Sequence, residues 1–282
     1  MWSPLLASAS EEWDGDEVFL LIGSAITCVV GIGMWVRWLS SAGGLGREKA
    51  QRGLMGFAVL VSLGVLAVVT WAWTAKEIRH GQPYMWLVLA MGGAWLSVCS
   101  GLFRWVGLSV REDACERRNR AAALAVSGGV VGAMFIFCGA NTGEGPSFWN
   151  NVFSAMLGGA IWFALWQTLE DTTKVSLAIT EDRDVATGLR LGAFLAAEGL
   201  VLGRALAGNW HSVGATTRDF LRDGWPAIVL LVIAAIIERM LKPTAANPFP
   251  AWPTHGALAA LLYVAAAAGW VLRLGWWEGA PQ

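Results

Sequence analysis

The sequence predicts an all-α integral membrane protein with about eight transmembrane helices. Hydrophobic residues make up 56% of its 282 residues and charged residues only 15%, whereas soluble domains average about 25% charged residues. Eight apolar stretches each approach the roughly 20 residues that a helix needs to cross the hydrocarbon core. Backbone groups in lipid must find their hydrogen-bond partners within the same segment, so these stretches are expected to be helices.

The expected spans cover residues 17–38, 53–75, 84–107, 121–140, 148–168, 185–208, 225–241 and 255–275. The fourth contains no charged residue, and the seventh is the shortest. Pro226 suits the first turn of that seventh helix, where a missing backbone N–H is tolerated. The spans divide the chain into an acidic tail (1–16), a three-span region (17–110), a paired repeat region (111–208) and a two-span region (209–282).

Lysine and arginine residues are distributed unequally between alternate loops, which sets orientation in a membrane. The loops after spans one, three, five and seven are basic, with Arg47, Lys49, Arg52, Arg111, Arg117, Arg118, Arg120, Lys174, Arg183, Arg239 and Lys242. The opposite side carries only Lys76, Arg79, Arg218, Arg222 and Arg273. We therefore expect the basic loops in the cytoplasm and both termini outside it. Most of the 18 tryptophans lie near span ends, as is typical of residues at the membrane interface.

A two-span unit is repeated at an offset of 65 residues. The segment Asn119-Arg-Ala-Ala-Ala-Leu124 opens the fourth span, and Asp184-Val-Ala-Thr-Gly-Leu189 opens the sixth. The second copy begins two spans after the first, so the copies should run parallel, unlike the inverted repeats of many transporters.

These residues resemble a bacterial inner-membrane family that is catalogued as domain of unknown function 350. The first matching segment contains Asn119, Ala121, Ala122, Ser127, Gly128 and Gly132, and the second contains Asp184, Ala186, Gly188, Gly192 and Gly199. The match covers about residues 100–208 and departs from the family at Asp184, where asparagine is usual, and at Glu198. The resemblance implies a bacterial inner-membrane protein without an established activity, and its gene neighbourhoods imply a partner linked to envelope stress.

Small residues recur four positions apart in the fourth and sixth spans. The pairs are Gly128 and Gly132, Gly188 and Gly192, and Gly199 and Gly203. This spacing places both glycines on one helix face, where another backbone can approach closely. The partner helix belongs either to the same chain or to a second protomer of a homo-oligomer.

Asn119 and Asp184 each precede a helix, and either side chain can accept hydrogen bonds from the free N–H groups of a first turn. We interpret both as N-caps, with a polar rim for a lipid headgroup or an ion as the alternative. Glu170 and Asp171 end the fifth span as a carboxylate pair. A solvated helix end is the expectation for this pair, and attraction of cations is the alternative.

The sixth span is unusual because it carries Arg190, Glu198 and Arg204. Arg190 and Arg204 lie near opposite ends, so their long side chains could snorkel to the interfaces. Glu198 lies roughly 20 Å from the start of the helix and about 15 Å from its end, and a carboxylate at that depth is costly unless neutral or paired. We expect a neutral Glu198 hydrogen-bonded to a neighbouring helix, with a proton, ion or solute site as the alternative.

The sequence contains no CxxC pair and no His/Cys cluster, which predicts no metal ion and no cofactor. A net charge of −1 gives no reason to expect a nucleic-acid partner, and no constellation of residues predicts catalysis. The expected function is a non-enzymatic inner-membrane scaffold that contacts membrane lipids, oligomerises or joins a membrane complex, and binds a cytoplasmic protein. The alternative is a channel or transporter that uses Glu198.

Overall fold

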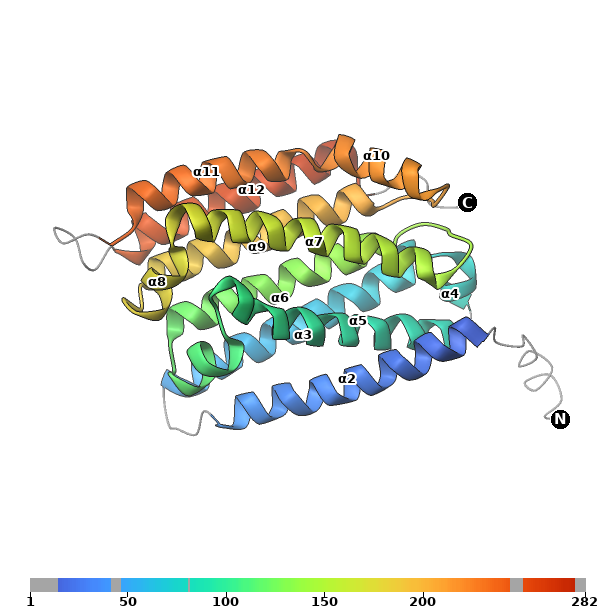
Figure 1. The fold of residues 1–282 in the computed structure, drawn as a ribbon, viewed down its shortest axis with the longest axis horizontal. Coiled ribbons are helices and arrows are strands. Elements are labelled where there is room, and N and C mark those ends of the chain that lie inside the picture. The colour runs from blue at the N-terminus through green and yellow to red at the C-terminus, as the bar shows by residue number, and fades with distance from the viewer. Residues whose placement is uncertain (1–14, 42–46, 81, 244–250, 277–282) are drawn as a thin grey trace.

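The computed structural model describes residues 15–41, 47–80, 82–243 and 251–276 as a bundle of long helices (Figure 1). The helices are α2 (Gly15–Ser41), α3 (Arg47–Trp73), α4 (Lys76–His80), α5 (Gln82–Leu102), α6 (Arg120–Ala140), α7 (Phe148–Thr173), α8 (Val175–Thr180), α9 (Val185–Leu206), α10 (Val213–Gly224), α11 (Pro226–Leu241) and α12 (Leu258–Leu274). Three shorter helical segments complete the chain, namely η1 (Phe103–Val106), η2 (Val110–Glu116) and η3 (Trp252–Ala257). The acidic tail up to residue 14 lies outside the described residues.

Seven of the expected spans are matched by helices that are long and apolar enough to cross a membrane. The third crosses as α5 continued by η1, and the last as η3 continued by α12. The fifth is longer than expected because α7 continues to Thr173, where Lys174 adopts a left-handed conformation with φ of 54° and ends the helix. The chain is therefore an all-α multi-pass membrane protein, as the composition predicts.

The seventh expected span requires a correction. Its helix, α11, begins with Pro226 as predicted but has only 16 residues, fewer than the roughly 20 that a crossing needs. It reaches spanning length only together with α10, from which it is bent by 42°. α10 carries Arg218, Asp219, Arg222 and Asp223, and these charges explain why hydropathy alone placed the start of the span too late.

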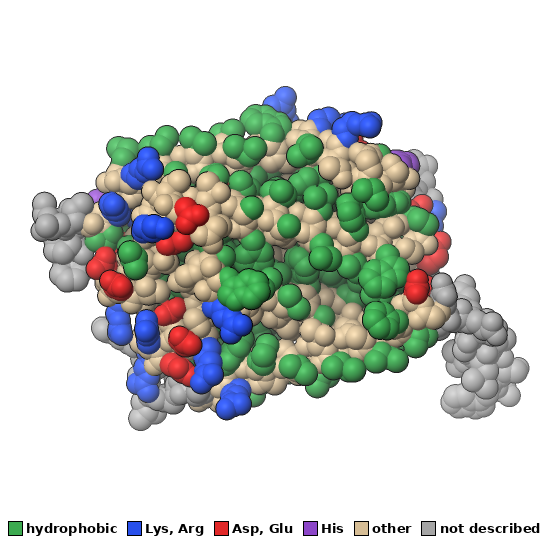
Figure 2. Space-filling view, viewed as in Figure 1, with side chains coloured by type: hydrophobic (Ala, Val, Ile, Leu, Met, Phe, Trp, Pro, Cys, Tyr) green, Lys and Arg blue, Asp and Glu red, His purple; other side chains and the backbone are tan. Residues whose placement is uncertain are grey.

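The layers of the bundle place α6 and α9 at its centre. α2 lies at one edge and α10 to α12 lie at the opposite edge (Figure 1). α6 and α9 make the most extensive helix–helix contact, and α6 also packs on α3 while α9 packs on α12. Charged side chains gather mostly toward the ends of the bundle, and hydrophobic side chains dominate the middle of the visible face (Figure 2). The three expected regions thus pack together as one bundle.

The backbone leading into α6 has the same geometry as that leading into α9. The residues before the two caps, Arg118 and Arg183, have φ of 53° and 55°. The amide of Asn119 donates to the carbonyl of Asp113, and the amide of Asp184 donates to that of Ala178. The corresponding residues of the two units each lie 65 residues apart, which is the offset of the sequence repeat: Arg118 and Arg183, Asn119 and Asp184, and Asp113 and Ala178.

Candidate functional site

α9 carries two sets of residues with different chemistry, and the sequence singled out members of both. One set is the glycines that pack on α6, and the other is a series of buried polar side chains that begins at the N-cap Asp184 and continues through Thr187 and Arg190 to Glu198. Glu198 lies 14 residues after Asp184, which corresponds to about 21 Å along the helix axis. The polar series therefore extends from one end of the bundle to well inside it.

Asp184 caps α9 as the sequence predicts. Its Oδ1 accepts the Ala186 amide at 3.2 Å and its Oδ2 accepts the Thr187 amide at 2.9 Å. The Thr187 hydroxyl also donates to Oδ2 at 2.5 Å. Both carboxylate oxygens are used within the first turn, so the interpretation as an N-cap is confirmed.

Arg190 does not snorkel to the interface, which corrects the expectation. Its side chain is fully buried and forms a two-pronged ion pair with Glu238 of α11, with Nε to Oε1 at 2.6 Å and Nη2 to Oε2 at 2.7 Å. Nη1 donates to the His255 carbonyl at 2.6 Å, and Nη2 donates to the Thr187 hydroxyl at 2.8 Å. A planar guanidinium with several fixed donors is suited to such a buried bidentate pair, and Glu238 supplies the charge that lets Arg190 remain inside.

Glu198 of α9 and Tyr263 of α12 are buried polar residues without hydrogen-bond partners among the described residues. Both carboxyl oxygens of Glu198 and the hydroxyl of Tyr263 are buried and make no hydrogen bond to the described residues. The Tyr263 ring packs edge-on against Phe194, with centroids 6.0 Å apart. The expected bond from Glu198 to a neighbouring helix is therefore not formed. An unpaired carboxylate in this position would be costly, because charged groups inside a membrane protein need a partner.

Arg204 lies near the opposite end of α9 and is only partly exposed. Its guanidinium donates to the carbonyls of Gly275 and Leu274 where α12 ends. Arg204 therefore caps the last turn of a neighbouring helix instead of reaching only into the interface. This contact fixes the C-terminal ends of α9 and α12 relative to each other.

The glycine face of α9 packs directly on the glycine face of α6. A Cβ atom at Gly128 would collide with the backbone of Gly192, one at Gly199 with the backbone of Gly132, and one at Gly188 with Ala121. Gly132 lies against the Leu195 carbonyl and Gly203 against that of Phe135. The residue numbers of the contacting positions increase in the same direction along both helices, so α6 and α9 run parallel. These glycines serve contacts within the chain, and the alternative of contact between protomers is wrong for these faces.

Asn119 caps α6 and also ties it to the second unit. Its Oδ1 accepts the amides of Ala121 at 3.0 Å and Ala122 at 3.3 Å. Its Nδ2 donates to the Ile179 carbonyl in α8 at 2.5 Å. The side chain is buried, so it does not form an open polar rim for a headgroup or an ion.

Three polar residues contribute to the interior although the sequence did not single them out for it. Glu238 and Tyr263 were hidden in apolar spans, and only the isolated acidic residue in the run Ile236-Ile237-Glu238 signalled the first. Glu170 was expected at a solvated helix end, but it is buried and accepts the Ser176 amide at 2.8 Å and the Ser176 hydroxyl at 2.7 Å. Its neighbour Asp171 is exposed, as expected.

Within the described part of the chain, no group of three or more His, Cys, Asp or Glu side chains is arranged to hold a metal ion. The polar groups in the interior are instead a buried ion pair between Arg190 and Glu238 and two buried groups without hydrogen-bond partners among the described residues, Glu198 and Tyr263. No family model, curated protein or solved structure matches the chain.

Proposed function

We propose that this protein is a non-enzymatic scaffold or subunit of a membrane-associated complex, and that it assembles as a homo-oligomer or with a cytoplasmic partner. The observation that supports this function best is the direct packing of α6 on α9, where glycines bring the two backbones into contact. The centre of the bundle is therefore occupied by backbone and small side chains. A rigid, filled centre suits a protein that presents surfaces, whereas a solute pathway needs a polar cavity along the membrane normal.

Reconstitution into sealed liposomes tests this proposal. Vesicles containing the full-length protein and a trapped pH-sensitive dye should collapse an imposed proton gradient no faster than empty vesicles, with or without added Na⁺ or K⁺. Flux that rises with protein density would contradict the scaffold function. The mass of the detergent-solubilised protein, measured by light scattering, should exceed that of one 30.2 kDa chain.

A second candidate is a proton-dependent transporter, which is favoured by the buried and unpartnered carboxyl of Glu198. A group that is neutral in the closed bundle could release its proton only in a conformation that admits water. Glu198→Gln keeps the size and the polar character of the side chain but cannot titrate. If the parent protein shows flux, this variant should fold and assemble normally and lose the pH-dependent part; a variant with unchanged flux would remove Glu198 from the pathway.

We further infer a bacterial inner membrane, a duplicated unit with an offset of 65 residues, and both termini outside the cytoplasm. The family resemblance supports the membrane, the equal backbone geometry before α6 and α9 supports the duplication, and the basic loops support the orientation. Two exposed positions at opposite ends of the bundle are suited to a labelling test, namely Gly214 in the first turn of α10 and Glu181 directly after α8.

An impermeant maleimide added to intact cells should label Gly214→Cys and should not label Glu181→Cys. The native Cys115 contributes little background because burial raises its pKa to about 11, a shift that Glu116 reinforces and Arg52 opposes. Its thiol therefore stays protonated near neutral pH, and the thiolate is the reactive form. The reverse pattern of labelling would place the basic loops outside.

A further inference from the structure

A long groove runs between α2 and the rest of the bundle. α2 touches α5 closely where Gly31 meets Ser97 and where Cys28 meets Gly93. Beside this line of contact, a hollow of about 560 Å³ is lined by Thr27, Val30 and Met34 of α2 and by Val98 and Leu102 of α5. A second hollow of about 510 Å³ shares Thr27, Val98 and Leu102 with the first and continues to Phe19. The two hollows therefore form one groove.

The dimensions of this groove match a lipid chain. Met34 and Phe19 lie 15 residues apart on α2, which corresponds to about 22 Å. One leaflet of the hydrocarbon core is about 15 Å thick, so the groove is long enough to hold a complete acyl chain. Its inner walls are apolar except for small hydroxyl side chains, and Ser97 and Ser100 bond their own helix carbonyls.

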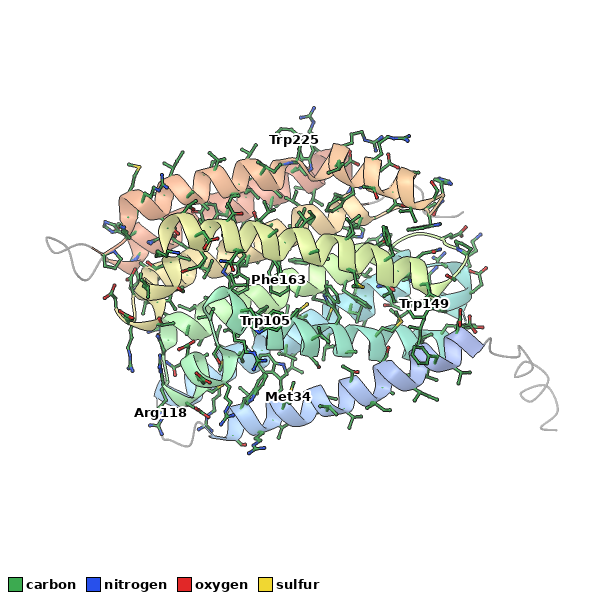
Figure 3. The ribbon with its side chains drawn as sticks, viewed as in Figure 1. Met34, Trp105, Arg118, Trp149, Phe163 and Trp225 are labelled. Carbon is green, nitrogen blue, oxygen red and sulfur yellow. The ribbon has the colours of Figure 1, made fainter. Side chains whose placement is uncertain are left out.

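One end of the groove is basic and aromatic. Arg104 and Trp105 of η1 and Arg111 of η2 line it, and Figure 3 labels Met34 and Trp105 on its two sides. Arg111 is paired with Glu116 at 2.7 Å. Arg104 is exposed, and no hydrogen bond or ion pair to the described residues engages its guanidinium. Glu112 also lines this end, but residues 103–120 carry five arginines against three acidic residues, so the segment has a net positive charge.

We propose that the groove is a binding site for one anionic phospholipid. The phosphate lies at Arg104, the glycerol region lies beside Trp105, and one acyl chain follows α2 past Thr27. The charge at the headgroup end selects an anionic lipid over a zwitterionic one, and tryptophan favours the same interfacial depth. The site is separate from the polar series of α9, and the proposal does not depend on scaffold or transport function.

The experiment measures lipid binding to the full-length protein by native mass spectrometry in detergent. Palmitoyl-oleoyl phosphatidylglycerol and phosphatidylcholine are titrated separately, so that only the headgroup differs. We expect the first molecule of phosphatidylglycerol to bind several-fold more tightly than the first molecule of phosphatidylcholine. Arg104→Gln should weaken that binding about fivefold, which corresponds to the attraction of one basic side chain to an anionic lipid, and should leave phosphatidylcholine binding unchanged.

Two further variants separate the groove from general surface charge. Arg120→Gln removes an exposed arginine at the same end of the molecule but outside the groove, and it should leave the first binding event unchanged. Gly101 lines the groove and has open space around it, so Gly101→Phe should fill the groove and abolish the tight site while the protein retains its melting temperature.

Equal losses in Arg104→Gln and Arg120→Gln would show diffuse attraction and overturn the proposal. Phosphatidylglycerol binding to Gly101→Phe at the strength of the parent would also overturn it. A change of oligomeric mass in Gly101→Phe without a change in lipid binding would assign the groove to a second copy of the chain instead.

Discussion

α2 and α6 are almost equally apolar, yet they occupy opposite environments. Their most hydrophobic windows have mean hydropathies of 2.2 and 2.1, but only 11% of the residues in the α2 window are buried, against 78% in α6. α2 contacts mainly α5 at the edge of the bundle, whereas α6 packs on α9 and α3 at its centre. Hydropathy therefore identifies a helix that enters the membrane and does not say whether lipid or protein surrounds it.

The positions of the small residues account for the difference. In α6, Cβ atoms at Gly128, Gly132 and Gly139 would collide with backbone atoms of α9. In α2, Gly23 and Gly33 have open space around them, and only Gly31 meets a neighbour. Because lipid chains are as apolar as leucine, close packing is among the forces that decide which helices associate, and α6 and α9 pack closely through their glycines.

The largest effect should come from breaking the polar contact that holds α9 to α11. Removal of one partner from a buried ion pair typically costs about 3–5 kcal/mol. Glu238→Gln should be more damaging than Arg190→Gln, because a lone glutamate can take up a proton and become neutral, whereas a guanidinium stays charged. The measurement is the thermal melting temperature of each variant in the same detergent.

The double variant Arg190→Met with Glu238→Leu provides the control for this pair. It removes both charges together, so it should be more stable than Glu238→Gln alone. Equal stability of Glu238→Gln and the parent would mean that the ion pair does not fix α9, and that glycine packing alone separates the centre from the edge.

A smaller effect is expected from the glycine face itself. Gly132→Leu places a side chain against the Leu195 carbonyl, where the backbone has to move, and overpacking of this kind costs roughly 1–3 kcal/mol or somewhat more. Gly33→Leu adds the same atoms to an open, exposed position on α2 and should stay within about 0.5 kcal/mol of the parent. Unfolding in mixed micelles measures both, and equal destabilisation of the two would refute the distinction between the helices.

The smallest effect concerns the cap at the start of α6. Asn119→Ala removes the acceptor for the first turn, which costs about 1 kcal/mol, and it also removes the bond to the Ile179 carbonyl. Asn119→Asp keeps the acceptor but cannot donate to Ile179, so its stability should lie between those of the parent and the alanine variant. If the aspartate and alanine variants melt together, the bond to α8 accounts for the whole contribution of Asn119.

The sequence predicted the features that depend on local chemistry. Helix limits near Arg120 and Val185, the caps at Asn119 and Asp184, and the proline at the start of α11 follow from rules that involve neighbouring residues only. The glycine spacing also predicted a close approach of helices, although it could not identify the partner as α9 or as another protomer.

The features that depend on distant residues were not predictable. Arg190 meets Glu238, which lies 48 residues later, and no spacing rule connects the two. The burial of Glu170 depends on Ser176 in the following short helix, and the length of the seventh span depends on the bend before Pro226.

The parallel arrangement of α6 and α9 has an electrostatic consequence. Neighbouring helices in an up-and-down bundle usually run antiparallel, so that their peptide dipoles oppose and largely cancel, but these two point the same way. Each brings roughly half a positive charge to its N-terminus, and both N-termini lie at the end of the bundle that contains Asn119 and Asp184. The Asp184 carboxylate accepts the first-turn amides of α9 and opposes the positive end of that helix, whereas the neutral Asn119 accepts those of α6 without adding a charge. The second unit thus places a negative charge at the N-terminus of its helix, and the first unit does not.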